Sequence, residues 1–352
     1  MTYFTMGPVE MYPETLQIEG SQPLYFRTEE FGAKMKECER MFLQSVNAPE
    51  DACYFPLCCS GTGAMDAVIS NLFTEKNRVL VIDGGSFGHR FFEICEHYGV
   101  PTDRYVIAFR EAFSPKHLER YADGGYTALL VNACDTSTGQ KYDLDYLGNF
   151  CRQNHMLLVV DAVSAYLADE IDMTRQGIDV LFTASQKALA LSPGAALVAL
   201  SAGARERVNR NRAPYYFDFN AAIDNQRRGQ TPFTCPAGTM LALHQRLSYI
   251  LETGIKETVA LHARRAAYFR EKVARLPVEI PEIPLSNCCT PLLFPKENAR
   301  SVFENLKNRY GLVLTPSGGE WKNKQLRVGH LGNLGDADFD LLICKLEEEL
   351  RT

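Results

Sequence analysis

The sequence predicts an α/β protein with a large domain, built on a mostly parallel β-sheet flanked by helices, and a smaller C-terminal α+β domain. Over the first two thirds of the chain, continuous apolar runs alternate with helix-like segments, as expected for strands covered on both faces. Beyond about residue 275 this alternation ends and prolines punctuate the chain. We therefore expect residues 1–250, including an N-terminal arm, to form the large domain and residues 251–352 the small one.

Short apolar runs in the first 200 residues are the expected strands of the large sheet. They lie at 79–83, 128–131, 157–161, 180–183 and 196–200. The segments between them favour helices, at about 63–73, 88–98, 115–122 and 143–154. Because open α/β sheets bind ligands where their strands end, polar residues at the ends of these runs are candidates for chemistry.

The remainder of the chain changes from helical to mixed character. Residues from about 237 to 275 are expected to be largely helical, with an interruption near Gly254. A short strand is predicted at 291–294, followed by helices near 297–309 and 336–350. This mixture of short strand and helices is the basis for a separate α+β domain.

Composition and charge exclude several classes of protein. The chain has 352 residues, a formal charge of −6 and 46% hydrophobic residues, so it has ample apolar material for a core and no basic nucleic-acid footprint. We expect neither a signal peptide nor a membrane span, because no basic segment precedes an apolar run at the N-terminus and no apolar stretch approaches 18 residues. The 11 cysteines include no Cys-x-x-Cys spacing. We interpret most of them as buried thiols in a reducing cytoplasm and expect no metal site.

A glycine-rich turn, Ser60-Gly-Thr-Gly63, precedes a helix-like run. Such a turn exposes backbone N–H groups at a helix N-terminus, where the helix dipole favours an anion such as a phosphate. Glycine turns before helices are common, so this turn alone leaves a purely structural interpretation open.

Two ionisable residues lie in apolar surroundings farther along the chain. Asp161 ends an apolar run, where a poorly solvated carboxylate needs a cationic partner such as a protonated pyridine nitrogen. Lys187 lies between two apolar runs among small residues, where an amine can form a Schiff base with a carbonyl cofactor. Taken singly, Asp161 could instead cap a helix or bind a metal, and the Lys187 head group could reach solvent.

The order of these motifs resembles a known family. The chain is similar over nearly its whole length to class V, fold-type I, pyridoxal-phosphate aminotransferases. The nearest branch contains the alanine–glyoxylate, serine–pyruvate and 2-aminoethylphosphonate–pyruvate aminotransferases. The matching motifs are Met6–Glu10, Ser60–Met65, Gly85–Arg90, Asp135–Gly139, Asp161–Ser164, Ser185–Lys187, Thr234–Pro236 and Arg327–Asn333.

The resemblance implies a role for each matching residue. Lys187 corresponds to the Schiff-base lysine, Asp161 to the acid that pairs with the pyridinium nitrogen, and Arg327 to the arginine that binds the substrate carboxylate. The remaining positions correspond to contacts with the cofactor: Phe87 and Val163 on the two ring faces, Thr136 near the ring oxygen, Thr62, Gly63, Ala64 and Gln186 on the phosphate side, and Thr234 on the phosphate of the neighbouring subunit.

The sequence departs from the family pattern at two positions. Asp135 stands where a glutamate is usual, and Ala64 can offer only its N–H to the phosphate. Both departures are compatible with cofactor binding. Among other polar residues, we interpret Arg90 and His330 as structural and Arg227–Arg228 as a solvated loop, and we favour a structural role for Arg27 over a substrate contact.

The resemblance predicts a homodimeric transaminase with a shared active site and pyridoxal 5'-phosphate as cofactor. It would move an amino group from a small donor of the alanine or serine type to a 2-oxo acid such as glyoxylate or pyruvate. A 2-aminoethylphosphonate–pyruvate transaminase is the alternative. A lyase or desulfurase is disfavoured because Gln186 stands where desulfurases carry histidine. A non-catalytic cofactor-binding protein is disfavoured because both Lys187 and Arg327 are present.

Overall fold

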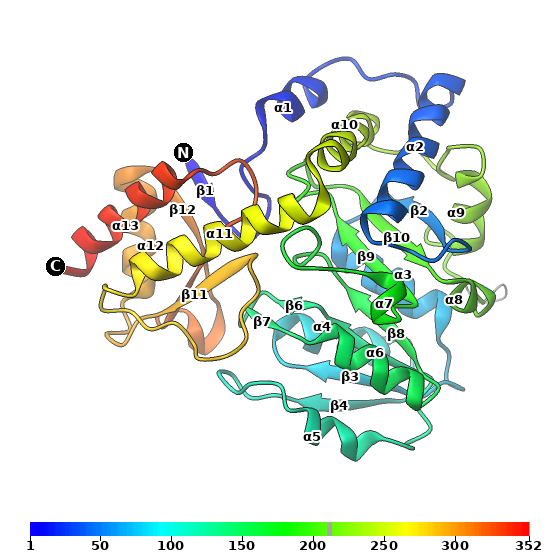
Figure 1. Ribbon diagram of the computed structural model, residues 1–352, viewed down its shortest axis with the longest axis horizontal. Helices are drawn as coiled ribbons and strands as arrows, with labels where there is room; N and C mark the ends of the chain where they lie inside the picture. The colour runs from blue at the N-terminus through cyan, green and yellow to red at the C-terminus, as the bar shows by residue number, and fades with distance from the viewer. Residues whose placement is uncertain (210–212, 352) are drawn as a thin grey trace.

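The computed structural model describes residues 1–209 and 213–351, and two main β-sheets organise this part of the chain (Figure 1). Beside them, Cys134–Asp135 (β6) and Gln140–Lys141 (β7) form a two-stranded sheet. Within these residues the large sheet has seven strands in the order β2-β10-β9-β8-β5-β3-β4. Their bounds are Cys53–Leu57 (β2), Val79–Asp83 (β3), Thr102–Val106 (β4), Ala128–Asn132 (β5), Leu157–Asp161 (β8), Val180–Ala184 (β9) and Ala196–Leu200 (β10). All five strands expected from the apolar runs are confirmed.

Most neighbouring strands of the large sheet are parallel, but β10 is an exception. It runs antiparallel to both β9 and β2, whereas β9, β8, β5, β3 and β4 are mutually parallel. The chain passes from β9 to β10 through the short segment 185–195, which an antiparallel neighbour permits and a parallel one does not. Lys187 therefore lies in a turn between two adjacent strands.

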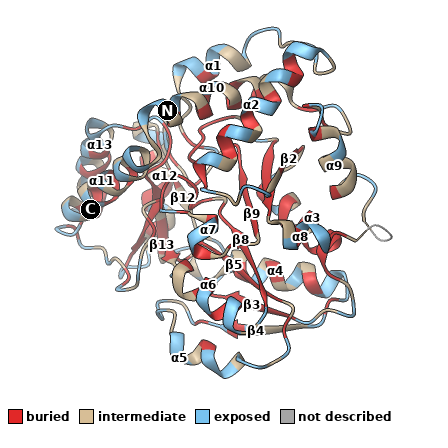
Figure 2. Cartoon of the chain, turned by 45° about the vertical axis from the view of Figure 1, so that its right-hand side comes forward, coloured by how far each residue is buried: buried red, intermediate tan, exposed pale blue. Residues whose placement is uncertain are grey.

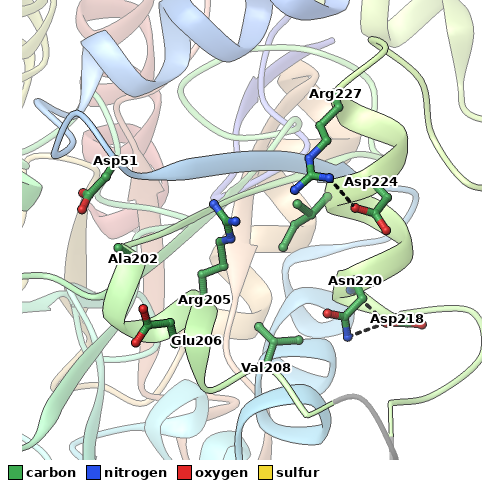
Figure 3. Close-up of a pocket in the computed structure, with 10 residues that line it drawn as sticks. Asp51, Ala202, Arg205, Glu206, Val208, Asp218, Asn220, Asp224 and Arg227 are labelled. Atoms are coloured by element: carbon green, nitrogen blue, oxygen red, sulfur yellow. Dashed lines mark hydrogen bonds and ion pairs between the residues drawn. The ribbon is translucent and has the colours of Figure 1, made fainter.

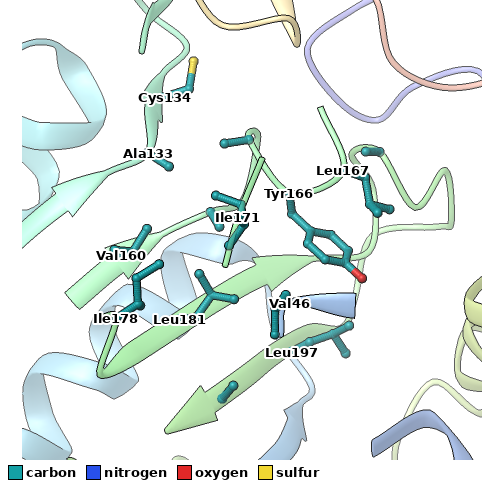
Figure 4. Packing of buried hydrophobic residues seen from close by; sticks show 14 of the residues in the cluster. Val46, Ala133, Cys134, Val160, Tyr166, Leu167, Ile171, Ile178, Leu181 and Leu197 are labelled. Atoms are coloured by element: carbon teal, nitrogen blue, oxygen red, sulfur yellow. The ribbon is translucent and has the colours of Figure 1, made fainter. Parts of the chain in front are cut away.

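The strands of the large sheet are apolar because they are covered on both faces. Every residue of β5, β8, β9 and β10 is buried (Figure 2). Successive residues point to opposite faces, so Val159 and Val160 belong to different hydrophobic clusters. Figure 4 shows one of these clusters, where Val160, Leu181 and Leu197 from successive strands pack together. This core fixes the strand ends that carry the site.

The helices that flank the large sheet begin close to the predicted positions. Helices α3 and α4 follow β2 and β3, and α6 precedes β8. The helix expected at 115–122 is instead a four-residue helix followed by a 3₁₀ turn. The helices up to residue 253 are Pro13–Glu19 (α1), Glu29–Ser45 (α2), Gly61–Leu72 (α3), Ser86–His97 (α4), Pro115–Leu118 (α5), Leu144–Gln153 (α6), Met173–Gln176 (α7), Ala202–Glu206 (α8), Phe219–Gln226 (α9) and Ala237–Thr253 (α10).

The C-terminal part is built on a second sheet, in the order β1-β12-β13-β11. Its strands are Thr2–Phe4 (β1), Cys289–Leu293 (β11), Leu312–Pro316 (β12) and Gln325–Gly329 (β13), and its helices are Ile255–Val273 (α11), Ala299–Tyr310 (α12) and Asp336–Arg351 (α13). Figure 1 shows α11 extending from the large sheet toward this smaller one. None of the helices among the described residues is long and apolar enough to cross a membrane.

The start of the N-terminal arm departs from the expected domain division. Strand β1 pairs in parallel with β12, so residues 2–4 belong to the small sheet rather than to the large domain. The cause is apolar packing, because Phe4 is fully buried and its ring lies 5.6 Å from that of Phe339. The arm then passes to the large domain, where Met6 joins the core of the large sheet. The boundary at residues 250 and 251 stays a prediction.

Candidate active site

A cavity of about 100 Å³ lies where the strands of the large sheet end. It brings together seven of the residues predicted from the sequence: Thr62, Phe87, Thr136, Asp161, Val163, Gln186 and Lys187. The other lining residues are Ser60, Gly61, Met65, Cys134 and Ser164. Residues separated by more than 120 positions in the chain thus meet at one edge of the sheet, as the parallel strands require.

Lys187 is held inside the protein by the N-terminal arm. Its Nζ donates a hydrogen bond to the carbonyl oxygen of Met6, and the residue is only 9% exposed. Burial lowers the pKa of the Lys187 amine below its ordinary value, with the positive charge of Arg327 acting in the same direction. A Cβ atom on Gly7 would lie 2.7 Å from Lys187 Cδ. The arm therefore fits closely over a lysine that gives up its proton more readily than a free lysine, and the neutral amine is the nucleophilic form.

Asp161 ends β8 and is buried at the floor of the same cavity. Its Oδ2 accepts a hydrogen bond of 2.7 Å from Asn132 Nδ2, and its Oδ1 accepts one of 2.8 Å from the backbone N–H of Val163. Burial nevertheless raises the pKa of Asp161 to about 6, more than these hydrogen bonds and Lys187 lower it. A buried carboxylate in this condition is stabilised by a further cation.

The N-terminus of α3 forms another wall. Ser60 caps the helix, since its side chain accepts from the N–H of Gly63. Gly61 lets this turn approach Val163, because a Cβ at Gly61 would lie 2.7 Å from Val163 Cγ2. The side chain of Thr62 faces the cavity. This end of the helix is a favourable place for an anionic group.

Two of the predicted phosphate contacts do not line the cavity. Ala64 is fully buried, and its N–H already donates to Ser60 O over 3.1 Å. Gly63 is packed against Cys59, where an added Cβ would lie 2.6 Å from Cys59 Cβ. In this chain the side chain of Thr62 is therefore better placed toward a ligand than either of these backbone groups.

Helix α4 brings Phe87 and Arg90 to the cavity edge. The Arg90 guanidinium lies 4.8 Å from the centre of the Phe87 ring and donates to Thr62 Oγ1 over 3.1 Å. Asp135 fixes the start of the helix, since its Oδ2 accepts from the N–H groups of Phe87 and Gly88, each over 3.0 Å. The aspartate at this position can thus anchor α4 without the additional methylene of a glutamate.

Arg327 lies on β13 and lines a neighbouring cavity of about 370 Å³. Its two terminal nitrogens donate to the carbonyl oxygens of Thr136 (3.0 Å) and Pro316 (3.1 Å). Its Nε is buried without a hydrogen-bond partner among the described residues. The two cavities share the turn after β6 (Cys134–Asp135), with Thr136 lining one and Ser137 the other. Arg327 is therefore positioned to bind an anion next to the Lys187 cavity.

Thr234 is not part of either cavity in its own chain. It is exposed and follows Phe233, whose ring stacks on that of Tyr216 at 4.9 Å. Arg27 donates to Gln230 Oε1 and Thr231 O at 2.8 and 2.9 Å, so it secures the segment that leads to Thr234. A contact of Thr234 with a neighbouring subunit stays a prediction.

His330, which the sequence analysis interpreted as a structural residue, lies in surroundings that agree with this role. This side chain is fully buried, and its ring nitrogens lie 3.0 Å from Asn287 O and 3.2 Å from Thr290 Oγ1. Burial lowers the pKa of His330 to about 3. A neutral imidazole in this position holds the residue after β13 against the segment 287–290 of the small domain.

A larger cavity, of about 690 Å³, lies away from these residues beside α8 and α9 (Figure 3). It contains charges of both signs, including an ion pair of 3.1 Å between Arg227 and Asp224. None of the site residues predicted from the sequence lines it. Its volume alone therefore does not make it the active site.

Three residues of the site were given no role in it by the sequence analysis. Asn132 ends β5 and orients Asp161, Met6 supplies a carbonyl oxygen to Lys187, and Arg90 connects Phe87 with Thr62. A polar residue at the end of the apolar run 128–131 was the available signal for Asn132. Met6 belongs to a motif of the family, but nothing in the sequence indicated its contact with Lys187, which lies 181 positions away.

The fold and the site define a fold-type I enzyme of the aminotransferase class. The pattern of the family described as "Aminotransferase class-V" matches residues 14–279, about three quarters of the chain. The chain belongs to this family.

Individual relatives cover nearly the whole chain. A protein named "Soluble hydrogenase, small subunit" from Synechococcus sp. is 29% identical over 98% of this chain and 91% of its own length. The structure of an aspartate aminotransferase of subgroup IV from Thermus thermophilus is 27% identical, with a TM-score of 0.92 over 100% of this chain and 99% of that one. An alanine–glyoxylate aminotransferase structure from Nostoc sp. is 26% identical, with a TM-score of 0.93 over 100% and 96% of the two chains.

Proposed function

We propose that this chain is a pyridoxal-phosphate-dependent transaminase that transfers an amino group from a small donor of the alanine or serine type to a 2-oxo acid such as glyoxylate or pyruvate. One observation carries the proposal: a buried lysine with a lowered pKa and a buried carboxylate with a raised pKa line a single cavity. The family and the alanine–glyoxylate relative support it.

The residues of the cavity fit this cofactor in charge and shape. Asp161 needs a cation, which a protonated ring nitrogen would be. The first turn of α3 and Thr62 suit the phosphate, with the guanidinium of Arg90 close by. Phe87 and Val163 supply apolar surface for a planar ring. Gln186 Oε1 is buried without a partner among the described residues, so a polar group of the ligand would satisfy it.

Pyridoxal phosphate supplies a reactive carbonyl carbon and a ring that accepts electrons. Lys187 Nζ would hold that carbonyl when no substrate is bound. Once released, the Nζ amine would act as the base that takes the donor α-proton and as the acid that gives a proton back. Asp161 keeps a proton on the ring nitrogen, and Arg327 orients the substrate through its carboxylate.

The alternative donor, 2-aminoethylphosphonate, also fits an anion site at Arg327, because a guanidinium binds phosphonate and carboxylate oxygens through similar forked contacts. The active unit that we propose is a homodimer in the cytoplasm, with Thr234 reaching the phosphate bound by the other subunit. Such an arrangement would explain why Thr234 is exposed in its own chain.

The test is a half-reaction screen with the cofactor-loaded protein. Alanine, serine and 2-aminoethylphosphonate are added separately, and the absorbance of the lysine-bound cofactor is followed. We expect this absorbance to disappear with the true donor and to return when glyoxylate or pyruvate is added. A protein that binds the cofactor through Lys187 but shows no change with any amine would refute the proposed transamination.

A further inference from the structure

Two aromatic side chains, Phe109 and Trp321, form one wall of the cavity that Arg327 lines. Phe109 lies in the segment after β4, and Trp321 ends the 3₁₀ turn Gly319–Trp321 between β12 and β13. Their ring centres are 3.8 Å apart, with a tilt of 36° between the ring planes. Both rings line the cavity that Arg327 also lines. The pair therefore closes one side of this cavity from two separate parts of the fold.

The charge of this cavity comes from Arg327 alone among the described lining residues. Its neighbours are three apolar side chains, Ile107, Phe109 and Trp321, together with glycines and uncharged polar residues. Arg110, which follows Phe109, is paired with Glu279 at 3.1 Å and is not part of the lining. One carboxylate therefore finds a cation in this cavity, and a second one does not.

Four of the five uncharged polar side chains of the lining are already engaged within the chain, namely those of Ser137, Thr138, Ser317 and Gln325. Ser317 donates to Gln325 Oε1 over 2.9 Å, and Gln325 Nε2 donates to Ser137 O over 3.1 Å. Ser137 Oγ in turn donates to Asp135 over 2.6 Å. These bonds hold the wall in place and end on a buried carboxylate. A second substrate carboxylate would lose hydration without gaining a second cation among the described lining residues, and Asp135 would repel it.

We infer that Phe109 and Trp321 are specificity-determining residues, and that they select an amino acid or 2-oxo acid with one carboxylate and an apolar side chain. The inference rests on the proposed function, because it takes Arg327 as the clamp for the reacting substrate. The cavity of about 370 Å³ has more room than the methyl side chain of alanine needs. The substrate range thus extends to larger apolar side chains, such as that of leucine, and excludes aspartate.

The test compares half-reaction rates of the cofactor-loaded protein with alanine, leucine and aspartate. In the wild type, aspartate should react with a rate constant per unit concentration about 100-fold or more below that of leucine. Trp321→Ala and Phe109→Leu should each lower the leucine-to-alanine ratio, by about tenfold for the larger deletion, and Trp321→Phe should restore most of it. Phe109→Arg should raise the aspartate rate at least about tenfold, because it adds the missing cation.

Phe113→Leu is the matched control. Phe113 lies in the same segment as Phe109 but packs on Tyr105 and Tyr142 instead of lining the cavity. Its substitution should leave the leucine-to-alanine ratio unchanged. An aspartate rate equal to that of leucine in the wild type would overturn the inference, as would an unchanged ratio in both Trp321→Ala and Phe109→Leu.

A binding measurement separates this inference from the proposed reaction. Calorimetry with 4-methylpentanoate and succinate, which have no amino group, measures recognition without turnover. We expect 4-methylpentanoate to bind more tightly, and to change the emission of Trp321, which is the only tryptophan of the chain. If no amine reacts but 4-methylpentanoate still binds more tightly, the transaminase proposal fails and the inferred selectivity of Phe109 and Trp321 is supported. Tighter binding of succinate refutes the inferred selectivity, even if the protein carries out transamination.

Discussion

Replacing Asp161 by asparagine should make the cofactor-free protein more stable and the cofactor-loaded protein less able to react. The substitution keeps the shape and removes the buried charge. In the present geometry, the new side-chain N–H of asparagine at position 161 would face another donor, the amide N–H of Asn132. However, Asn132 Oδ1 is buried without a hydrogen-bond partner in the described part of the chain. If the Asn132 amide flips, this oxygen can accept from the new N–H group. The loss in hydrogen bonding is therefore about 1 kcal/mol or less.

The gain comes from removing a desolvated carboxylate. Burial raises the pKa of Asp161 from 3.8 to about 6, which corresponds to about 3 kcal/mol. Because the folded-state pKa lies above the unfolded one, this penalty is absent below about pH 4, grows as the pH rises, and is complete above about pH 6. At pH 8 we expect cofactor-free Asp161→Asn to exceed the wild type by about 2 kcal/mol in unfolding free energy. At pH 4 the advantage should vanish.

Urea unfolding of both proteins at pH 4 and pH 8, with and without cofactor, measures these differences. Asp169→Asn is the control, because burial also raises the pKa of Asp169, which does not line the cavity. Adding cofactor should stabilise the wild type and Asp169→Asn more than Asp161→Asn, by about 2 to 4 kcal/mol. Equal stabilisation of all three proteins, or an Asp161→Asn variant that is less stable at pH 8 than the wild type, would refute the role given to Asp161.

Three further predictions concern the substrate clamp, the arm and the assembly. Arg327→Ala should lower kcat/KM for alanine and glyoxylate about 30- to several-thousand-fold, with Arg327→Lys recovering part of the loss, while the cofactor absorbance is unchanged; steady-state kinetics and spectra decide this. Gly7→Ala should displace Lys187, since the added Cβ would lie 2.7 Å from its Cδ at a backbone φ of +127°. Titration should show that Gly7→Ala binds the cofactor more weakly than the control Gly99→Ala. At Gly99 the backbone φ is also positive, but no atom of the described residues lies within 4 Å of an added Cβ. Sedimentation should give a dimer or larger, with loss of cofactor affinity in Thr234→Val; a fully active monomer at assay concentration would contradict the shared site.

The fold could be predicted where burial is uniform along a strand. The runs 157–161 and 196–200 are apolar throughout because both faces are covered. Strand β4, Thr102–Val106, was missed because it is the edge strand and exposes Arg104 and Val106. Strand β2 carries Pro56, which weakens a strand prediction. The antiparallel direction of β10 depends on a tight turn that composition does not specify.

The site could be predicted where an ionisable residue stands among apolar residues in the sequence itself. The apolar surroundings of Asp161 and Lys187 indicated buried charged groups, and both are buried in the structure. Contacts that depend on distant segments could not be predicted. The Met6 carbonyl reaches Lys187 only because β1 pairs with β12 and thereby fixes the start of the arm. The meeting of Phe109 with Trp321 likewise depends on how the two sheets are placed, and no periodicity encodes it.

The attachment of the cofactor to Lys187 is the central claim and can be measured directly. The cofactor-loaded protein is reduced with borohydride, digested and mapped by mass spectrometry. The label should lie on the peptide that contains Lys187, and Lys187→Ala should carry no reducible label while it remains folded. A label on another lysine, or undiminished labelling of Lys187→Ala, would contradict the account.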